Sequence, residues 1–219
     1  MKTVVAVFAH PDDEAFGPGG TIALLCQDHE VHIITVTGGE EGKCSIDKHH
    51  ESLSKIRRQE LLESAKILGV KKVHFLGYKD GMLSNHYYHE IASKIEEKLK
   101  EIKPEILLTF EMRGVSGHLD HVAVSFITTY VFKRMTMIKE LLYYFITPAQ
   151  SKPSEDNYFI HFPKGFASSL ADRVYDTSSV WETKIKAMKA HKSQEHDAKR
   201  IIKTLKTIPK KEHFFITHN

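Results

Sequence analysis

Two short clusters of ionisable side chains have the residue types that metal binding and acid–base chemistry require. The first is His10-Pro11-Asp12-Asp13-Glu14. Packed inside a protein without a cation, its carboxylates would repel one another and lose their hydration. Histidine and aspartate are zinc ligands, and the spacing of His10 and Asp13 lets a tight turn direct both to one ion while Asp12 points elsewhere. The alternative is a solvated turn whose aspartates only cap the next helix.

The second cluster is Gly117-His118-Leu119-Asp120-His121. His10, Asp13 and one of the two new histidines would supply three protein ligands and leave a fourth position for water, as in catalytic zinc sites. Asp120 can orient one histidine through its ring nitrogen. In the alternative interpretation, Asp120 caps a helix and His118 and His121 lie at the surface.

Both clusters directly follow predicted strands. Residues 4–8 form a continuous run of β-branched and aromatic side chains, and residues 105–110 form a second run, as expected for strands buried on both faces. Ligands of open α/β sheets collect at the carboxyl ends of the strands. If the two strands are neighbours, the clusters converge on one site.

The remaining pattern alternates strands with helices. It predicts strands over 4–8, 31–37, 73–76, 105–110, 141–147, 173–175 and 213–217, helices over 21–27, 51–68, 91–102, 122–137, 181–191 and 195–205, and a surface loop over 151–157. This order predicts an α/β fold in three layers, a mostly parallel sheet with helices on both faces. We expect a single domain over residues 1–219, with the weakest pattern in about 150–219, which pack on the same domain.

Composition excludes several classes of protein. Hydrophobic residues make up 41% of the 219 positions and charged residues 27%, which excludes a disordered chain. The 31 basic and 28 acidic residues nearly cancel, so no nucleic-acid partner is expected. The two cysteines, Cys26 and Cys44, are too few for a disulfide framework. With no apolar stretch near the length of about 18 residues that spans a bilayer, and no signal peptide, we expect a cytoplasmic protein.

Further motifs accompany the two clusters in a fixed order. They are Ala9-His10-Pro11-Asp12-Asp13-Glu14, Thr37-Gly38-Gly39-Glu40, Arg57 with Glu60, Leu68-Gly69-Val70, Phe75-Leu76-Gly77 with Asp80-Gly81, Gly117-His118-Leu119-Asp120-His121 and Lys189-Ala190-His191-Lys192-Ser193-Gln194. In this series the chain resembles the LmbE/PIG-L family, zinc-dependent N-deacetylases with a Rossmann-like fold that mostly act on N-acetylglucosamine-type groups. The likeness spans about residues 4 to 194.

The resemblance implies a metal centre with a base beside it. His10 and Asp13 become metal ligands, and His121 becomes the third ligand. Asp12 becomes the general base. The implied metal is Zn²⁺, although the same ligands accept another divalent ion such as Fe²⁺.

The resemblance also assigns four residues around the metal. His118 stabilises the developing oxyanion or protonates the leaving amine, with Asp120 behind it. Arg57 faces the substrate, although by its neighbours alone it would be a solvated residue. His191 contacts the substrate, or only interacts with the dipole of the helix that it ends.

The sequence therefore predicts a metal-dependent hydrolase that removes acetate from an N-acetylated amino sugar of the GlcNAc type or its conjugate, with a possible homo-oligomer implied by the resemblance. One alternative is a non-catalytic metal- or carbohydrate-binding protein on the same fold. Another, a nucleotide-binding protein, is disfavoured because Gly17-Pro18-Gly19-Gly20 lacks a phosphate-binding fingerprint. We interpret His49-His50, His86 and His89 as surface residues, and Tyr87-Tyr88 as packing residues.

Overall fold

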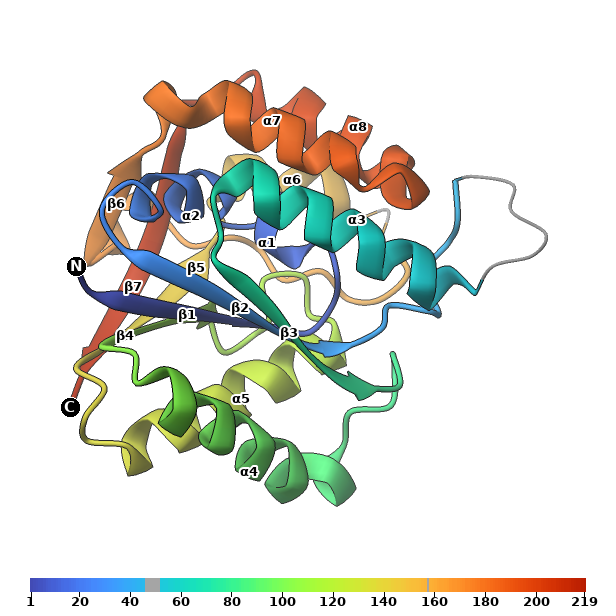
Figure 1. The fold of residues 1–219 in the computed structure, drawn as a ribbon. Helices are drawn as coiled ribbons and strands as arrows, with labels where there is room; N and C mark the ends of the chain where they lie inside the picture. The colour runs from blue at the N-terminus through green and yellow to red at the C-terminus, as the bar shows by residue number, and fades with distance from the viewer. Residues whose placement is uncertain (46–51, 157) are drawn as a thin grey trace.

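One seven-stranded sheet runs through the computed structural model, which describes residues 1–45, 52–156 and 158–219 (Figure 1). Its strands are β1 (Thr3–Phe8), β2 (Glu30–Thr37), β3 (Lys72–Tyr78), β4 (Ile106–Phe110), β5 (Glu140–Phe145), β6 (Arg173–Asp176) and β7 (Lys211–His218), in the order β3-β2-β1-β4-β5-β7-β6. The first five pair in parallel, whereas β7 is antiparallel to both β5 and β6. The predicted mostly parallel α/β sheet is confirmed.

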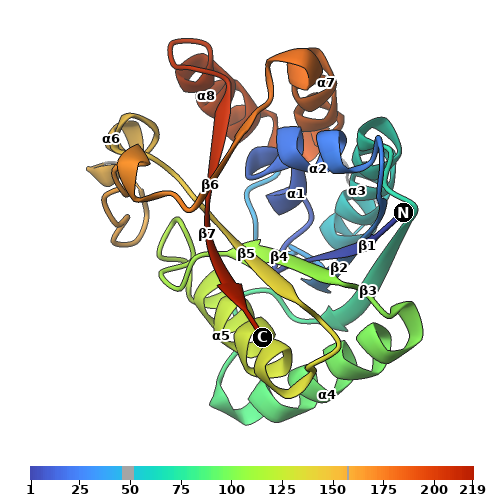
Figure 2. The ribbon, with the colours of Figure 1, turned by 90° about the vertical axis from the view of Figure 1, so that its left-hand side faces the viewer.

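Helices cover both faces of this sheet. They are α1 (Asp13–Phe16), α2 (Gly19–Leu25), α3 (Leu53–Leu68), α4 (Asn85–Ile102), α5 (Leu119–Arg134), α6 (Pro148–Glu155), α7 (Trp181–Ala190) and α8 (Glu195–Leu205). The α2, α3 and α7 helices lie on one face, and α4 and α5 lie on the other (Figures 1 and 2). None of the helices in the described ranges has the length and apolar character needed to cross a membrane.

The central strand β1 shows why the sheet lies inside the molecule. Val4, Ala6 and Phe8 pack in the core on one face, while Val5 and Val7 pack in the core on the other. A strand whose successive side chains are all apolar must be buried on both faces, which parallel sheets achieve with two helical layers. Because β1 is packed on both faces, its carboxyl end is held in place, which positions the residues that follow it.

The predicted surface loop over 151–157 was largely wrong, because α6 occupies Pro148–Glu155. Thr147 and Gln150 form a capping box at the start of this helix, and Pro148 stands in its first turn. Both features favour a helix start and are present in the sequence. Asn157, the last residue of the predicted loop, lies outside the described residues. The β6 and β7 strands join the main sheet, and the single domain stays a prediction.

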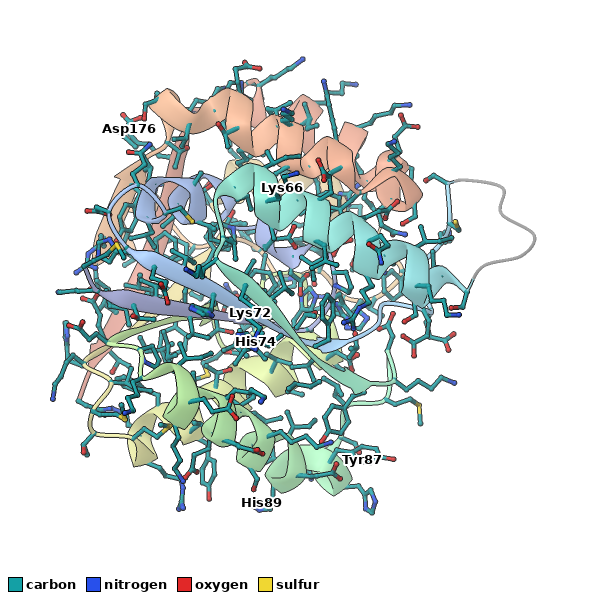
Figure 3. All side chains as sticks on the ribbon, in the orientation of Figure 1. Lys66, Lys72, His74, Tyr87, His89 and Asp176 are labelled. Carbon is teal, nitrogen blue, oxygen red and sulfur yellow. The ribbon has the colours of Figure 1, made fainter. Side chains whose placement is uncertain are left out.

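Further predictions from the sequence concern histidines expected at the surface and two tyrosines expected to pack. His86 and His89 are exposed on α4, as predicted, and Figure 3 shows His89 at the outer side of this helix. Tyr87 and Tyr88 pack against the core beneath α4. The histidines of His49-His50, predicted to lie at the surface, fall outside the described residues.

Candidate metal and catalytic site

The two predicted clusters meet at the carboxyl edge of the sheet, where β1 and β4 are neighbours. The Nδ1 atom of His10 lies 2.9 Å from Nε2 of His121. The Asp13 carboxylate lies beside both, with Oδ1 3.2 Å from Nε2 of His121 and Oδ2 3.9 Å from Nδ1 of His10. Ligand atoms at about 2.0–2.2 Å from a tetrahedral ion are separated by about 3.3–3.6 Å. The three side chains therefore converge closely enough to hold one cation.

The hydrogen bonds behind these histidines fix their tautomers. Nδ1 of His121 lies 3.0 Å from the carbonyl of Gly114, so that nitrogen carries the proton. Nε2 of His10 lies 2.8 Å from Oδ1 of Asp80 and donates to it. In neutral rings, the two nitrogens that face each other therefore both present lone pairs, next to the Asp13 carboxylate. This donor set fits a divalent metal ion.

The charges around the site also favour a cation. Burial lowers the pKa of His10, but the carboxylates of Asp120, Asp80 and Asp13 more than compensate and raise the pKa to about 10. Burial alone would raise the pKa of Asp13, yet the charge of His121 holds that pKa well below its usual range. The surroundings thus stabilise positive charge between His10 and Asp13.

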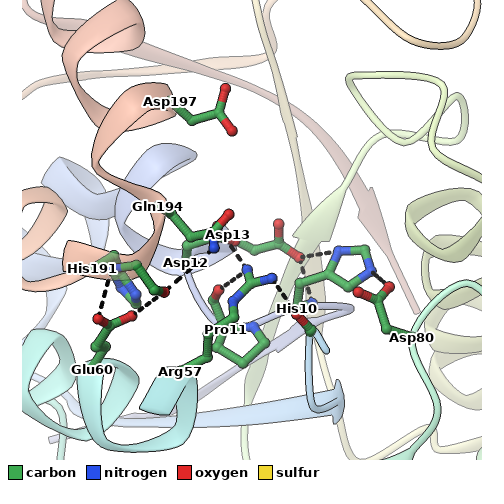
Figure 4. A network of polar contacts seen from close by, with 12 residues as sticks. His10, Pro11, Asp12, Asp13, Arg57, Glu60, Asp80, His191, Gln194 and Asp197 are labelled. Atoms are coloured by element: carbon green, nitrogen blue, oxygen red, sulfur yellow. Dashed lines mark hydrogen bonds and ion pairs between the residues drawn. The ribbon is translucent and has the colours of Figure 1, made fainter. Parts of the chain in front are cut away.

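Asp12 sits beside this centre in an unusual backbone conformation. Its φ is 121°, rare for a residue other than glycine, and its Oδ2 lies 2.8 Å from Nη2 of Arg57 (Figure 4). Burial raises the pKa of Asp12 to about 6, with Arg57 opposing the rise and Asp13 adding to it. A carboxyl group with a pKa near neutrality is suited to proton transfer.

Arg57 is buried, contrary to the solvated residue that its neighbours suggest. Besides Asp12, its guanidinium donates to the backbone carbonyls of Pro11 and Gly39. All three contacts are made to loops of the protein itself. A substrate-facing role for Arg57 stays a prediction, and the contacts support a role in positioning Asp12.

The placement of Asp120 corrects the expectation that it stands behind His118. The Asp120 carboxylate accepts hydrogen bonds from the backbone N–H groups of Gly81 (2.7 Å) and Leu83 (3.2 Å), and it lies 3.4 Å from Nε2 of His10. The histidine that Asp120 supports is therefore His10. The physical reason is that Asp120 occupies the first turn of α5, from which its side chain reaches the loop after β3.

His118, and not Asp120, caps α5. Its Nδ1 accepts a hydrogen bond from the backbone N–H of Asp120 at 3.2 Å, so a neutral ring carries its proton on Nε2. Burial, followed by the charges of His10 and His121, lowers the pKa of His118 to about 4. The ring edge contacts the His10 ring, with 4.8 Å between centroids. His118 is thus placed as a neutral N–H donor, and a cationic donor held by Asp120 is not supported.

Asp80 was missed as a partner of the site. The Asp80-Gly81 pair follows a predicted strand, so its position was a signal, but nothing in the sequence indicates which histidine it meets. Its carboxylate contacts His10, and burial of that carboxylate is outweighed by His10, so the pKa of Asp80 falls to about 2. Asp80 and Asp120 together hold the orientation of His10.

We expect Asp120→Asn to lower metal affinity by about 10- to 100-fold, because supporting partners of metal-binding histidines have effects of this size. Metal titration followed by elemental analysis measures the change. Asp172→Asn is the matched control, since Asp172 also accepts a backbone N–H bond, from Ile216 at 2.8 Å, away from the site. Equal affinities for the two variants would show that Asp120 does not support the metal centre.

A buried ion pair lies beneath Asp12 and was also not predicted from the sequence. Nε2 of His191 lies 2.7 Å from Oε1 of Glu14, and the other oxygen of Glu14 accepts the backbone N–H of Asp12 at 3.1 Å. Burial lowers the pKa of His191, but the carboxylates of Glu14 and Asp12 together outweigh burial and raise that pKa. The His191 side chain is 0% exposed, so the predicted substrate contact has no support in this structure. No local pattern relates two residues that are separated by 177 positions.

We expect His191→Ala to lower the free energy of unfolding by about 3–5 kcal/mol, because it leaves the Glu14 carboxylate buried without its cation. Urea denaturation measures the loss. His86→Ala removes an exposed imidazole and should stay within about 0.5 kcal/mol of the unmodified protein. A loss no larger than that of the control would contradict the ion pair.

A side chain of the protein itself binds the backbone N–H groups at the end of the Gly17–Gly20 segment. The Glu212 carboxylate accepts the backbone N–H groups of Gly20 (3.0 Å) and Thr21 (2.7 Å). Lys184 donates to Glu212 at 2.6 Å and to the carbonyl of Gly17 at 2.7 Å. The N–H groups that a phosphate would need are thus occupied, which argues against nucleotide binding.

The fold is that of an α/β protein with a Rossmann-like sheet, and its site has side chains that could hold a metal ion. Residues 5–132 match the model of the PIG-L family, described as GlcNAc-PI de-N-acetylase. The chain belongs to this family. The predicted family is therefore confirmed.

Relatives of known name are deacetylases. The chain is 30% identical over 199 residues to a probable N-acetyl-alpha-D-glucosaminyl L-malate deacetylase 2 of Bacillus cereus, covering 88% of this chain and 84% of that protein. It is 31% identical over 204 residues to diacetylchitobiose deacetylase of Thermococcus kodakarensis, covering 89% and 70%. The names of these relatives describe substrates that contain N-acetylglucosamine.

Solved structures share the fold. The N,N'-diacetylchitobiose deacetylase of Pyrococcus horikoshii matches with a TM-score of 0.72 and 24% identity, over 99% of this chain and 84% of that one. GalB, the 4-carboxy-2-hydroxymuconate hydratase of Pseudomonas putida, matches with a TM-score of 0.77 and 18% identity, over 100% and 97%. Because a hydratase has the same fold, the fold alone does not determine the reaction.

Proposed function

We propose that the protein is a metal-dependent N-deacetylase that hydrolyses the acetamide of an N-acetylated amino sugar of the GlcNAc type or its conjugate. The observation that carries the proposal is the convergence of His10, Asp13 and His121, with the Asp12 carboxylate held beside them. A binding protein without activity needs the three ligands but has no use for a strained aspartate with a pKa near 6.

His10, Asp13 and His121 would hold the metal, for which we propose Zn²⁺ because two imidazoles and one carboxylate suit that ion. When bound, such an ion supplies Lewis-acid activation of the amide carbonyl and of the attacking water. His118 also lies among these donors, and one ring nitrogen from each of His10, His118 and His121 could form a ligand group. We assign His118 to another role because its Nδ1 is occupied by the backbone N–H of Asp120, which leaves Nε2 protonated.

Asp12 accepts a proton from the attacking water, and Arg57 keeps the carboxylate aimed at the site. His118 directs its Nε2–H toward the oxygen that gains negative charge as the amide carbon becomes tetrahedral. The proton taken by Asp12 then passes to the nitrogen of the amide, so that the bond breaks to give an amine and acetate. The balance requires one water and no covalent intermediate.

A panel of N-acetylated substrates tests the proposal. We expect acetate release from N-acetylglucosaminides but not from N-acetylated amino acids of similar size, with metal content measured on the same sample. Metal binding without acetate release from any member of the panel would instead support the non-catalytic alternative. We further propose a cytoplasmic location, on the ground of the two-cysteine composition.

A further inference from the structure

The backbone conformation of Asp12 depends on the groups that surround it. Its φ of 121° lies in a region that residues other than glycine rarely adopt. Such a conformation persists only where neighbouring groups hold it. Because Asp12 is the base of the proposed reaction, the groups that hold its backbone also set the direction of its carboxylate. These contacts therefore bear on the reaction as well as on stability.

The peptide group between Pro11 and Asp12 is held from both sides. On one side, the carbonyl of Pro11 accepts a hydrogen bond from Nη2 of Arg57 (Figure 4). On the other side, the backbone N–H of Asp12 donates to Oε2 of Glu14 at 3.1 Å. Since a peptide group is planar, partners at its oxygen and at its hydrogen together fix its orientation. Arg57 also binds the Asp12 carboxylate, so Glu14 supplies the independent point of support.

The Glu14 carboxylate is itself fixed by two donors. Its Oε1 accepts the hydroxyl of Ser64 at 2.5 Å and Nε2–H of His191 at 2.7 Å. All three side chains are buried, with exposed fractions of 1% or less. Ser64 belongs to α3 and His191 follows the last residue of α7, so the carboxylate cannot rotate without losing contacts to two separate segments. Its Oε2 is therefore kept on the Asp12 N–H.

We propose that Glu14 is a positioning residue, which holds the backbone of Asp12 so that the Asp12 carboxylate is aimed at the attacking water. Ser64 and His191 act on the reaction through Glu14. This inference rests on the proposed deacetylase function, in which Asp12 accepts a proton from that water. It gives the buried His191, for which a direct substrate contact has no support, an indirect role in the reaction.

Two substitutions of Glu14 separate geometry from charge. Glu14→Gln keeps the length of the side chain, so its oxygen can accept the Asp12 N–H while its NH₂ group donates to the Ser64 hydroxyl and to a neutral His191. Glu14→Asp keeps the charge but is shorter by one carbon–carbon bond of about 1.5 Å. A misplacement of about 1 Å can cost about 100-fold in rate. We expect kcat to fall by about 10- to 100-fold in Glu14→Asp and to stay within threefold in Glu14→Gln, with KM within twofold in both.

Glu212→Gln and Glu212→Asp are the matched controls. Glu212 is also buried, also accepts backbone N–H groups, and also pairs with a buried cation, Lys184. Both controls should keep kcat within threefold. Full activity of Glu14→Asp, or an equal loss in Glu212→Asp, would overturn the positioning role. A larger loss in Glu14→Gln than in Glu14→Asp would also overturn it, because the charge of Glu14 would then matter more than its geometry.

Hydrogen exchange of the Asp12 amide, measured by NMR, gives a readout without turnover. Loss of its acceptor should make this amide exchange at least 10-fold faster in Glu14→Asp than in the unmodified protein, whereas Glu14→Gln should stay within threefold. If the unmodified protein hydrolyses no substrate, the deacetylase function fails, while the exchange rates still decide whether Glu14 holds Asp12. Equal exchange rates in the two variants would show that it does not.

Discussion

The Asp12→Asn variant should lose about 10²- to 10⁴-fold in kcat, the range contributed by a positioned general base. Asparagine keeps the size and one acceptor oxygen for Arg57, so the loop and its unusual φ should persist. It cannot accept the proton of water at neutral pH. Acetate release under saturating substrate measures the loss, and elemental analysis of the same sample should show unchanged metal content.

Asp28→Asn is the matched control, because the Asp28 side chain is 73% exposed and lies in the turn after α2. It should retain full activity. A rate for Asp12→Asn within threefold of the unmodified enzyme would exclude Asp12 as the base. Loss of the metal from this variant would make Asp12 a ligand instead.

Removal of metal by a strong chelator should abolish acetate release, and addition of Zn²⁺ should restore it. The same addition should raise the melting temperature, since an ion that binds only the folded state stabilises it by about 2.7 kcal/mol at 100 times Kd. The effect should be large because the ion relieves repulsion among the carboxylates around His10. Differential scanning calorimetry measures the shift.

His10→Ala and His121→Ala should lose this thermal response to Zn²⁺. His74→Ala is the control, because Nε2 of His74 lies 3.2 Å from Nδ1 of His32 and forms a histidine pair outside the site. It should keep the response. Activity that survives complete chelation, or a response that disappears with His74 alone, would refute the proposed metal centre.

The sequence predicts the sheet and the meeting of the clusters for physical reasons. The run from Val4 to Phe8 is apolar at every position and rich in β-branched side chains, which favours a strand buried on both faces. Clusters placed after two such strands must lie at the same edge if the strands are neighbours, as β1 and β4 are. The family and the mostly parallel fold could therefore be predicted from the sequence.

The residues that pair with the site residues could not be predicted from the sequence. Asp80 with His10, and Glu14 with His191, join segments that periodicity cannot relate to one another. The role of Asp120 was misplaced because its chain neighbour His118 was favoured over His10, which is 110 residues away. Local pattern shows which residues have useful chemistry, whereas the pairing of buried charges depends on packing.

The contact of Glu212 and Lys184 with Gly17 and Gly20 has a consequence for biosynthesis. Backbone groups of Gly17 and Gly20 bind the buried charge pair of Lys184 and Glu212, so the amino-terminal segment cannot make all of its native contacts before residue 212 has been synthesised. A nascent chain stalled on the ribosome with residue 200 just emerged should be digested readily by protease, whereas the released chain should resist. Early resistance would show that the amino-terminal half matures alone.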